Sequence, residues 1–467
     1  MNSTWALVVS LILIVASVLA RGINRDGSRP LIWHNNVWLA TLLLYATNLI
    51  AYDSSSSTAW LVLLSGLLAF NVASMVALPR PRNSVFSADV ETVTLKPLLS
   101  RRVLFLACAI YFVSFGLYLY NIHSNYGIGV LFSDPGSIRA ISLDGESYLS
   151  RTPQLARLGL NLGPVLLVIF AVRESVQRPL GLLTRSVMVL ILMATMLAML
   201  QRTNLFMAIL WYLAYTMSRH HIGSVEKTPV RGRSSLPAKP NPASINARRK
   251  KGFMVAAAGG VIVLVLAFQL MGSALGKTGQ QALSTDRVSP ELEASGLSNI
   301  YVYATAAVPA FLKLVESPNE QWPPERVPGQ QIVGDYNPQT YGVATLGPLT
   351  EFVPGVREWN PIAPFMNVGI LTNVFTWYEH PYRDFRLPGV VIFASIMGFV
   401  STRMFIDRFK SAQMYWAQSA VFSTLFLSTF VAKIGTAIFW VGLLFVVVVA
   451  LRSRKVSSPH SDIPDRS

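Results

Sequence analysis

The amino-acid sequence predicts an all-α polytopic membrane protein that crosses the bilayer about eleven times. Hydrophobic residues make up 52% of its 467 residues, and charged residues only 13%, a composition typical of multi-span membrane proteins. Apolar segments recur along the chain, and roughly 20 residues of helix suffice to cross the hydrocarbon core. The basic residues, which give a net charge of +16, cluster between these segments. They therefore indicate membrane orientation and not nucleic-acid binding.

The first apolar segment has no Lys or Arg before it, and Arg21 and Arg25 follow it. This pattern lacks the charged start of a signal peptide and predicts an uncleaved helix with its N-terminus outside. The predicted spans are residues 4–20, 37–52, 58–78, 103–122, 158–172, 183–200, 205–217, 253–271, 390–404, 415–432 and 436–451.

The sixth and seventh spans come from one long apolar stretch, residues 187–216, which is interrupted only by Gln201-Arg202-Thr203-Asn204. The segments on both sides, 173–185 and 219–251, are basic and should both be cytoplasmic. Two helices that meet at the interruption satisfy this requirement, whereas a single span does not. With this topology, 27 of the 39 Lys and Arg residues lie in predicted cytoplasmic segments, as the positive-inside rule expects.

The chain divides into six predicted regions. Proline-rich turns interrupt the longest polar region and leave room only for short helices, and the basic linker has the composition of a disordered segment held near anionic headgroups. The regions are residues 1–222 with spans one to seven, 223–252 as a disordered basic cytoplasmic linker, 253–272 with span eight, 273–388 as a large external loop with short helices, 389–451 with spans nine to eleven, and 452–467 as a cytoplasmic tail.

Arg202 is the only charged residue in its apolar stretch, at the predicted external ends of two helices. The side chain either reaches the lipid headgroups or faces an internal cavity and pairs with an anion, as intramembrane charges tend to do. Asn204 is placed to cap the next helix, which would direct backbone N–H groups at the same anion.

The stretch 373–389 combines an amide, a hydroxyl, an imidazole, guanidinium groups and carboxylates at the start of a span. It is either an interfacial collar that anchors the next helix or a substrate site. Asn373, Thr376, His380 and Arg383 would share one face of a helix. Because Pro381 disfavours helical geometry at His380, we expect a helix that ends near Glu379, followed by a turn.

Several functional classes are disfavoured by absent motifs. The sequence has no Walker loop, no GxGxxG, no CxxC, no HExxH and no Asp-x-Asp, so we predict neither nucleotide hydrolysis nor a zinc site. The external carboxylates are not clustered as a divalent metal on a diphosphate requires. We therefore predict no metal and no cofactor, and expect guanidinium groups to bind any phosphorylated substrate. Arg357, beside Pro-rich turns, is a further candidate for this role.

Three short motifs resemble those of the Wzy-type oligosaccharide repeat-unit (O-antigen) polymerases. Arg386 stands where the family usually has glycine. The matching residues are Arg202-Thr203 between two apolar segments, Phe352-Val353-Pro354 followed by Trp359 and Pro361, and Asn373-Val374-Phe375-Thr376 followed by Tyr382-Arg383-Asp384-Phe385, Pro388-Gly389 and Gly398.

The resemblance implies a GT-C-like lipid-sugar transferase architecture in a bacterial inner membrane, with a periplasmic N-terminus and large loop and a cytoplasmic C-terminus. It implies a metal-independent glycosyltransferase that moves a growing glycan from undecaprenyl diphosphate to the terminal hydroxyl of a lipid-linked repeat unit. The implied partners are these oligosaccharides, membrane lipids and a chain-length regulator protein. The expected catalytic residues are Arg202, Arg383, His380 and Asp384, with Asn204, Arg357, Asn373, Thr376, Tyr378 and Tyr382 binding substrate.

Other functions remain open at the level of the sequence. A ligase of the same architecture, which passes finished glycan to a lipid A core, would share these features. A flippase or transporter of lipid-linked oligosaccharides is the alternative from a different class, although such proteins often show two similar halves, and the sequence shows no internal repeat. A scaffold for an export complex is a third.

Overall fold

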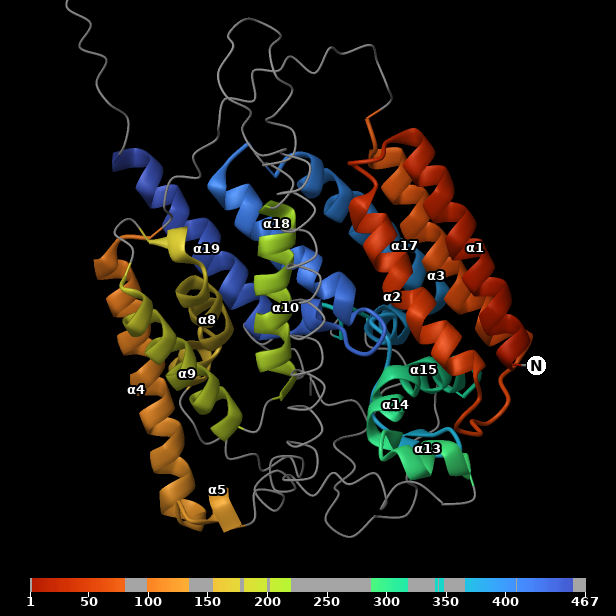
Figure 1. Ribbon diagram of the computed structural model, residues 1–467, viewed down its shortest axis with the longest axis horizontal. Coiled ribbons are helices and arrows are strands. Elements are labelled where there is room, and N and C mark those ends of the chain that lie inside the picture. Colours follow the sequence, from red (N-terminus) through yellow and green to blue (C-terminus); the bar gives the residue numbers. More distant parts are fainter. Residues whose placement is uncertain are drawn as a thin grey trace, which may run out of the picture.

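The computed structural model describes residues 2–79, 99–133, 154–176, 180–199, 202–219, 287–317, 341–342, 344–347, 366–408 and 410–456. These residues are mostly helical (Figure 1). The first half contains α1 (Asn2–Ile23), α2 (Arg29–Ala46), α3 (Ser57–Ala77), α4 (Arg101–Tyr126), α5 (Val130–Ser133), α7 (Gln154–Leu160), α8 (Gly163–Ala171), η1 (Arg173–Ser175), α9 (Leu182–Ala198) and α10 (Arg202–Arg219). The second half contains α13 (Pro290–Ser295), α14 (Ser298–Thr305), α15 (Ala307–Glu316), β1 (Met366–Asn367), β2 (Leu371–Thr372), α17 (Glu379–Ile406), α18 (Ala412–Leu427), η4 (Lys433–Gly435) and α19 (Ala437–Val456).

Four of the described helices, α1, α3, α4 and α17, are long and apolar enough to cross a membrane. The prediction of an α-helical membrane protein is therefore confirmed, while the number of eleven spans stays a prediction. The predicted eighth span and the linker before it lie outside the described residues, as do residues 457–467 of the tail. The expected break in the apolar stretch 187–216 is present, because α9 ends at Ala198 and α10 begins at Arg202.

The helices form two groups with α10 and α18 between them (Figure 1). One group contains α1, α2, α3 and α17, with the short helices α13, α14 and α15 below it in the view. The other contains α4, α8, α9 and α19. α18 packs against α2 and α17 of the first group, against α19 of the second, and against α10. α18 therefore connects the two groups of helices.

α3 and α17 approach each other closely at glycines. A Cβ at Gly398 would overlap the carbonyl oxygen of Phe70, and a Cβ at Gly66 would meet the side chains of Val390 and Tyr378. Small residues allow membrane helices to pack at such short range. The position of α17 is thereby fixed along its length, which in turn fixes the residues at its start.

The second helix begins earlier than the sequence predicts. We expected a span from Val37, but α2 starts at Arg29, and Asn35 in its second turn is buried and paired. Asn35 and Asn71 exchange amide hydrogen bonds of 2.7 and 3.2 Å. A side-chain amide whose donors and acceptors are satisfied by a neighbouring helix can lie inside an apolar bundle.

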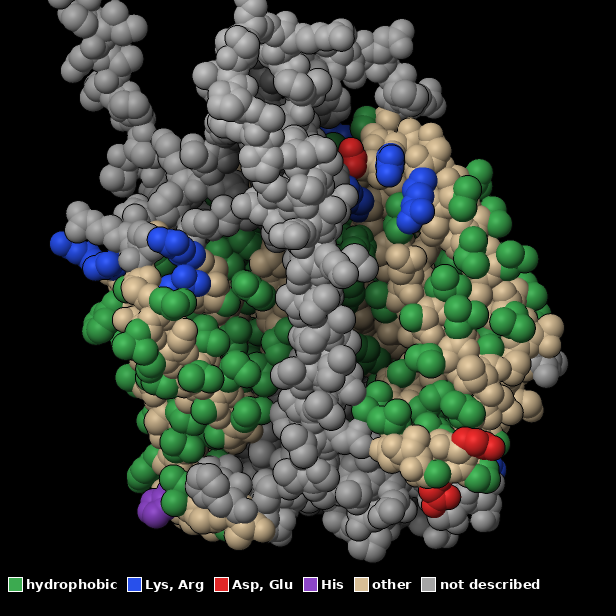
Figure 2. All heavy atoms as spheres, viewed as in Figure 1, with side chains coloured by type: hydrophobic (Ala, Val, Ile, Leu, Met, Phe, Trp, Pro, Cys, Tyr) green, Lys and Arg blue, Asp and Glu red, His purple; other side chains and the backbone are tan. Residues whose placement is uncertain are grey.

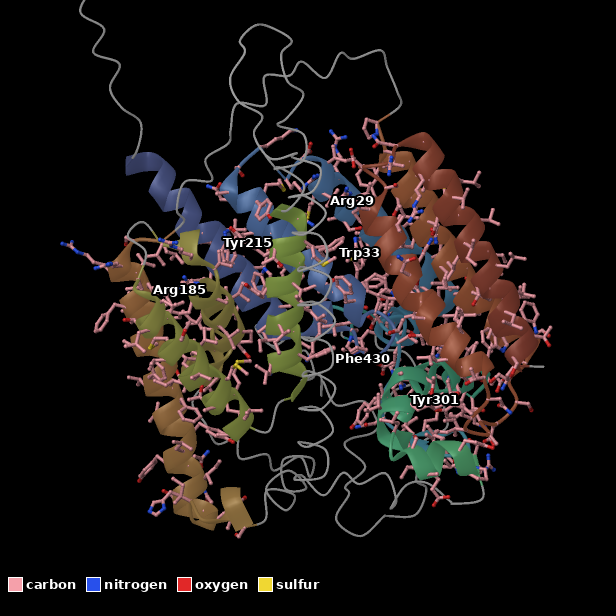
Figure 3. The ribbon with its side chains drawn as sticks, viewed as in Figure 1. Arg29, Trp33, Arg185, Tyr215, Tyr301 and Phe430 are labelled. Carbon is pink, nitrogen blue, oxygen red and sulfur yellow. The ribbon has the colours of Figure 1, made fainter. Side chains whose placement is uncertain are left out.

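Lys and Arg side chains gather along one edge of the molecule, the upper edge in Figure 2. Arg29 and Arg185 lie on this side (Figure 3). The starts of α2, α4 and α9 and the end of α17 carry these basic residues. The starts of α3, α10 and α17 lie toward the opposite edge (Figure 1).

Candidate functional site

A cluster of buried charges occupies the first turns of α17. Arg383 donates through Nε to Oε1 of Glu379 at 2.7 Å, and Nε2 of His380 lies 3.3 Å from Oε2 of the same carboxylate. Glu379 is 3% exposed and Arg383 2%. Burial of charge is costly even when the charges are paired, and in membrane proteins such residues commonly mark functional positions. These three residues are therefore the centre of the candidate site.

The start of α17 corrects the expected local structure. The helix begins at Glu379 instead of ending there. Pro381 is its third residue, a position where the missing N–H would have no intrahelical partner in any case. His380 and Arg383 are thus in one helix, three residues apart, whereas Asn373 and Thr376 precede it. The expected helix that ends near Glu379 is therefore absent, and of these four residues only His380 and Arg383 lie in a helix.

α17 is interrupted after its first turns, at Phe385 and Arg386. The backbone of Arg386 has φ 56° and ψ −143°, a region that is essentially restricted to glycine. Just beyond it, a Cβ at Gly389 would overlap the carbonyl oxygen of Pro381. Glycine adopts this conformation readily, whereas the arginine at position 386 adopts it with strain.

Substituting Arg386 by glycine should relieve that strain. We expect Arg386→Gly to unfold with a free energy about 1 to 2 kcal/mol higher than Arg386→Ala, because alanine retains the penalty for positive φ. Both variants lose the guanidinium, which lies 5.3 Å from the centre of the Tyr382 ring, so their difference isolates the backbone. Unfolding of the purified variants in detergent measures it, and equal stabilities would contradict this conformation.

Asp384 anchors a short turn to α17. Its Oδ1 accepts a hydrogen bond from the backbone N–H of Ala344 at 3.1 Å, and its Oδ2 accepts one from Thr345 at 2.8 Å. The residue is fully buried. A carboxylate held by two backbone donors is well suited to fix a loop. This observation favours a positioning role for Asp384. It leaves His380 as the better candidate for a general base, the group that would accept a proton from a substrate.

The connection between α18 and α19 brings the starts of α10 and α17 together. Trp377, two residues before α17, donates its backbone N–H to the carbonyl of Ser428 at 2.9 Å. Phe430, labelled in Figure 3, packs on Phe206 of α10 with ring centres 5.7 Å apart. Both contacts come from the same short segment, so the α18–α19 connection bridges the start of α10 and the residues just before α17.

Within that segment, η4 contacts both helices. Lys433 donates through Nζ to Oδ1 of Asn204 at 3.1 Å, and burial lowers the pKa of Lys433 to about 8. A Cβ at Gly435 would lie 2.6 Å from Nδ1 of His380 and 3.4 Å from the carbonyl oxygen of Ala344. η4 thus contacts the first turn of α10 through Lys433 and the imidazole of His380 in α17 through Gly435.

The predicted capping role of Asn204 is wrong. α10 begins at Arg202, so Asn204 is the third residue of the helix and not its cap. Its amide oxygen instead accepts a hydrogen bond from Nζ of Lys433. The backbone of Arg202 starts α10, while its side chain lies outside the described part. Arg357 and the surrounding Pro-rich motif also lie outside it.

The remaining predicted substrate residues lie near the start of α17 but differ in exposure. Thr376 and Tyr378 are fully buried, and the Tyr378 ring packs against Trp38 with centres 5.6 Å apart. Tyr382 is also buried, and its hydroxyl donates to the carbonyl of Val315 at 3.3 Å. Asn373 is half-buried in the segment between β2 and α17. Contact between these residues and sugars stays a prediction.

Glu379 and Lys433 are the residues that sequence reasoning missed. Glu379 was visible as one of several charges, but nothing in its spacing showed that it would contact both His380 and Arg383. Lys433 carried the same signal as Arg202, a lone cation between two apolar segments. That signal could have found Lys433 before its contact with Asn204 was known.

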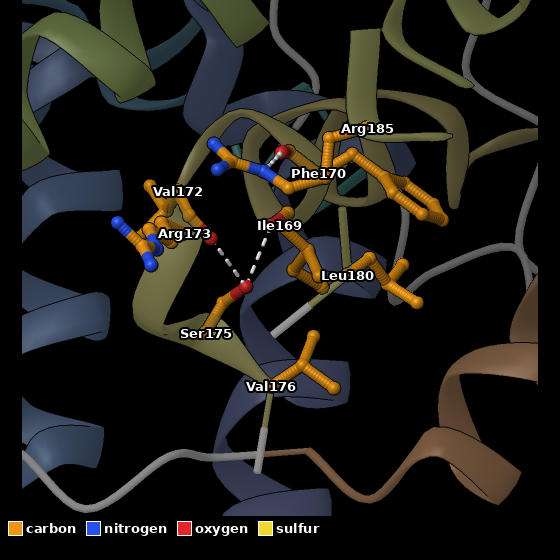
Figure 4. A pocket seen from close by; sticks show the side chains of 8 residues that line it. All are labelled: Ile169, Phe170, Val172, Arg173, Ser175, Val176, Leu180 and Arg185. Carbon is orange, nitrogen blue, oxygen red and sulfur yellow. Dashed lines mark hydrogen bonds between the residues drawn. The ribbon is translucent and has the colours of Figure 1, made fainter. Parts of the chain in front are cut away.

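A small surface pocket lies at the opposite, basic edge (Figure 4). Its polar groups hold the end of α8 in place. Arg185 donates through Nε to the carbonyl of Phe170 at 3.0 Å and through Nη2 to that of Ala171 at 2.7 Å. A cation bonded to the last carbonyls of a helix is a common way to cap it. The pocket is lined by Ile169, Phe170, Val172, Arg173, Ser175, Val176, Leu180 and Arg185.

In the part of the chain that the structure describes, no group of three or more His, Cys, Asp and Glu residues is arranged to hold a metal ion. Comparison with protein-family models, with curated proteins and with solved structures finds no match. The residues at the starts of α10 and α17 are therefore the basis for inferring a function.

Proposed function

We propose that this protein is a Wzy-type polysaccharide polymerase, a metal-independent membrane glycosyltransferase. It transfers a growing glycan from undecaprenyl diphosphate to the terminal hydroxyl of a lipid-linked repeat unit. The observation that carries this proposal is the buried cluster of Glu379, His380 and Arg383, which η4 joins to the first turn of α10. The eleven spans, the GT-C-like architecture and the chain-length regulator as a partner are parts of the same proposal.

In the reaction, the acceptor hydroxyl oxygen forms a bond to the anomeric carbon of the growing glycan. The bond from that carbon to the diphosphate oxygen breaks, and the diphosphate lipid leaves with the electron pair. The hydroxyl proton passes to His380. Glu379 supports this assignment, because its Oε2 lies 3.3 Å from Nε2 of the imidazole. A carboxylate there favours the proton on Nε2, which leaves Nδ1 of the neutral ring as the proposed proton acceptor.

The leaving diphosphate gains charge in the transition state, and fixed cations accelerate such a step. Arg202 is the proposed main cation, at a helix start whose N–H groups also favour anions. Asn373, Thr376, Tyr378 and Tyr382 are proposed to contact the sugars, and Arg357 to assist with the anion.

The proposed location is a bacterial inner membrane. The gathering of Lys and Arg at one edge (Figure 2) supports an orientation with this edge toward the cytoplasm. The starts of α10 and α17 then lie toward the periplasm, as does the N-terminus.

The decisive experiment supplies purified full-length protein with lipid-linked repeat units and looks for a ladder of polymer on a gel. We expect a ladder from the unsubstituted protein, and accumulation of single repeat units with Arg202→Ala. Arg102→Ala is the matched control, because Arg102 is an exposed arginine at the opposite edge.

Three outcomes would replace the proposal. A normal ladder from Arg202→Ala removes Arg202 from the mechanism. Transfer of finished glycan to a lipid A core, without polymerisation, identifies a ligase. Movement of lipid-linked oligosaccharide across vesicle membranes, without glycan synthesis, identifies a transporter.

A further inference from the structure

A turn that precedes α17 in the chain lies beside the imidazole of His380. It comprises residues 341–342 and 344–347, and we call it the covering turn. A Cβ at Gly435 would lie 2.6 Å from Nδ1 of His380 and 3.4 Å from the carbonyl oxygen of Ala344, so the turn and the ring meet at one place. Ala344 is fully buried, and His380 is 7% exposed. The atom proposed to accept the proton is therefore buried next to this turn.

Asp384 fixes the covering turn to the helix face that carries His380. Residues four apart on a helix lie on one face, and His380 and Asp384 both belong to the turns of α17 before its interruption. The Asp384 carboxylate accepts hydrogen bonds from the backbone N–H groups of Ala344 at 3.1 Å and Thr345 at 2.8 Å. These two hydrogen bonds hold the turn over the imidazole.

The covering turn has the features of a segment that opens while the helices stay folded. Its side chains Tyr341 and Leu346 are already 69% and 47% exposed, so their movement uncovers little further apolar surface. Tyr341 has φ 48°, and Arg386, on the α17 side of Asp384, has φ 56°. Both values are unfavourable for a residue with a Cβ, and such strain is common at ligand clamps and switches. Asp384 therefore holds the closed turn against backbone strain.

We infer that the covering turn is a lid, and that release of its backbone from Asp384 exposes Nδ1 of His380. The lid follows from the contacts of Ala344 and Asp384. That the molecule which enters beneath it is the acceptor sugar of a lipid-linked repeat unit rests on the proposed function. The closed lid keeps water from the imidazole, and an acceptor that displaces the turn reaches the ring.

Modification by diethyl pyrocarbonate, which acylates accessible neutral imidazoles, measures this opening. Purified full-length protein is treated in detergent, and mass spectrometry follows the rate of modification at each histidine. His123 is exposed and serves as the internal reference, whereas His34 is fully buried and reports loss of the fold. In the unsubstituted protein we expect His380 to react at least tenfold more slowly than His123, and His34 not to react.

Three substitutions distinguish a lid from fixed packing. Asp384→Asn should raise the rate at His380 by about tenfold or more, since it removes the charge that both backbone N–H groups bind. Asp407→Asn is the matched control, because Asp407 is a carboxylate at the other end of α17 that pairs with Arg403, and it should leave the rate at His380 unchanged. Tyr341→Gly should react more slowly at His380 than Tyr341→Ala, because glycine adopts the left-handed conformation without the penalty that alanine keeps.

The inference is overturned if His380 reacts as fast as His123 in the unsubstituted protein, or if Asp384→Asn leaves the rate at His380 unchanged. It is also overturned if Asp384→Asn exposes His34 together with His380, because the turn would then open only with the whole fold. Equal rates from the two Tyr341 variants, which keep the anchoring carboxylate, contradict the strained closed form. The proposed function is separate: it fails if the full chain makes no polymer from lipid-linked repeat units, whatever the rates of modification are.

Discussion

Replacing His380 by glutamine should slow polymer formation by about 100- to 10,000-fold, the usual contribution of a positioned general base. Glutamine retains a polar side chain of similar reach but cannot take up a proton at neutral pH. Binding of lipid-linked substrate should change little, because Arg202, the proposed main cation for the diphosphate, lies on α10. The measurement is the initial rate of polymer formation at saturating substrate, alongside the thermal stability of the variant.

A second substitution tests the same imidazole without changing it. Alanine at Gly435 would place a Cβ 2.6 Å from Nδ1 of His380, so the ring must shift, and the rate should fall by a smaller factor. Gly116→Ala is the matched control, since nothing lies within 4 Å of a Cβ there. An unchanged rate for His380→Gln would exclude His380 as the base. If His380→Gln and Gly435→Ala lose rate only in proportion to their loss of thermal stability, His380 has a packing role instead.

Hydropathy predicts the helices well where apolar residues continue without interruption, as in α1, α3 and α4. It fails where polar residues are paired between helices. The start of α2 was missed because Asn35 looks like a loop residue in the sequence, and only its exchange of hydrogen bonds with Asn71 makes it a helix residue in the core. The expected helix end near Glu379 was wrong for a different reason. The effect of a proline such as Pro381 depends on whether it lies in the first turn or in the interior of a helix.

The candidate site was predictable as a set of residue types but not as a set of contacts. His380, Arg383 and Asp384 are close in sequence, so their clustering could be seen directly. The contact of Lys433 with Asn204 joins residues 229 positions apart, and that of Asp384 with Ala344 joins residues 40 positions apart. Such contacts depend on how the helices pack, which composition and spacing do not specify.

Removing the carboxylate of Glu379 should have the largest effect on stability. Glu379→Ala takes away the carboxylate 2.7 Å from Nε of Arg383, a residue only 2% exposed. Breaking a buried pair from one side typically costs about 3 to 5 kcal/mol, because the remaining charge stays in a poorly solvated place. Arg383→Ala should cost a similar amount. Unfolding of the purified variants in detergent measures both.

The double variant separates the pair from its surroundings. Glu379→Ala with Arg383→Ala removes both charges, so it should be less destabilised than the sum of the two single variants, and the difference is the coupling within the pair. The same helix offers a control: Arg403 and Asp407 form an ion pair at 3.4 Å, but Arg403 is 50% exposed. Arg403→Ala should cost less than about 1 kcal/mol. If Glu379→Ala costs no more than Arg403→Ala, the charges at the start of α17 are solvated, and their burial cannot be the reason to place a site there.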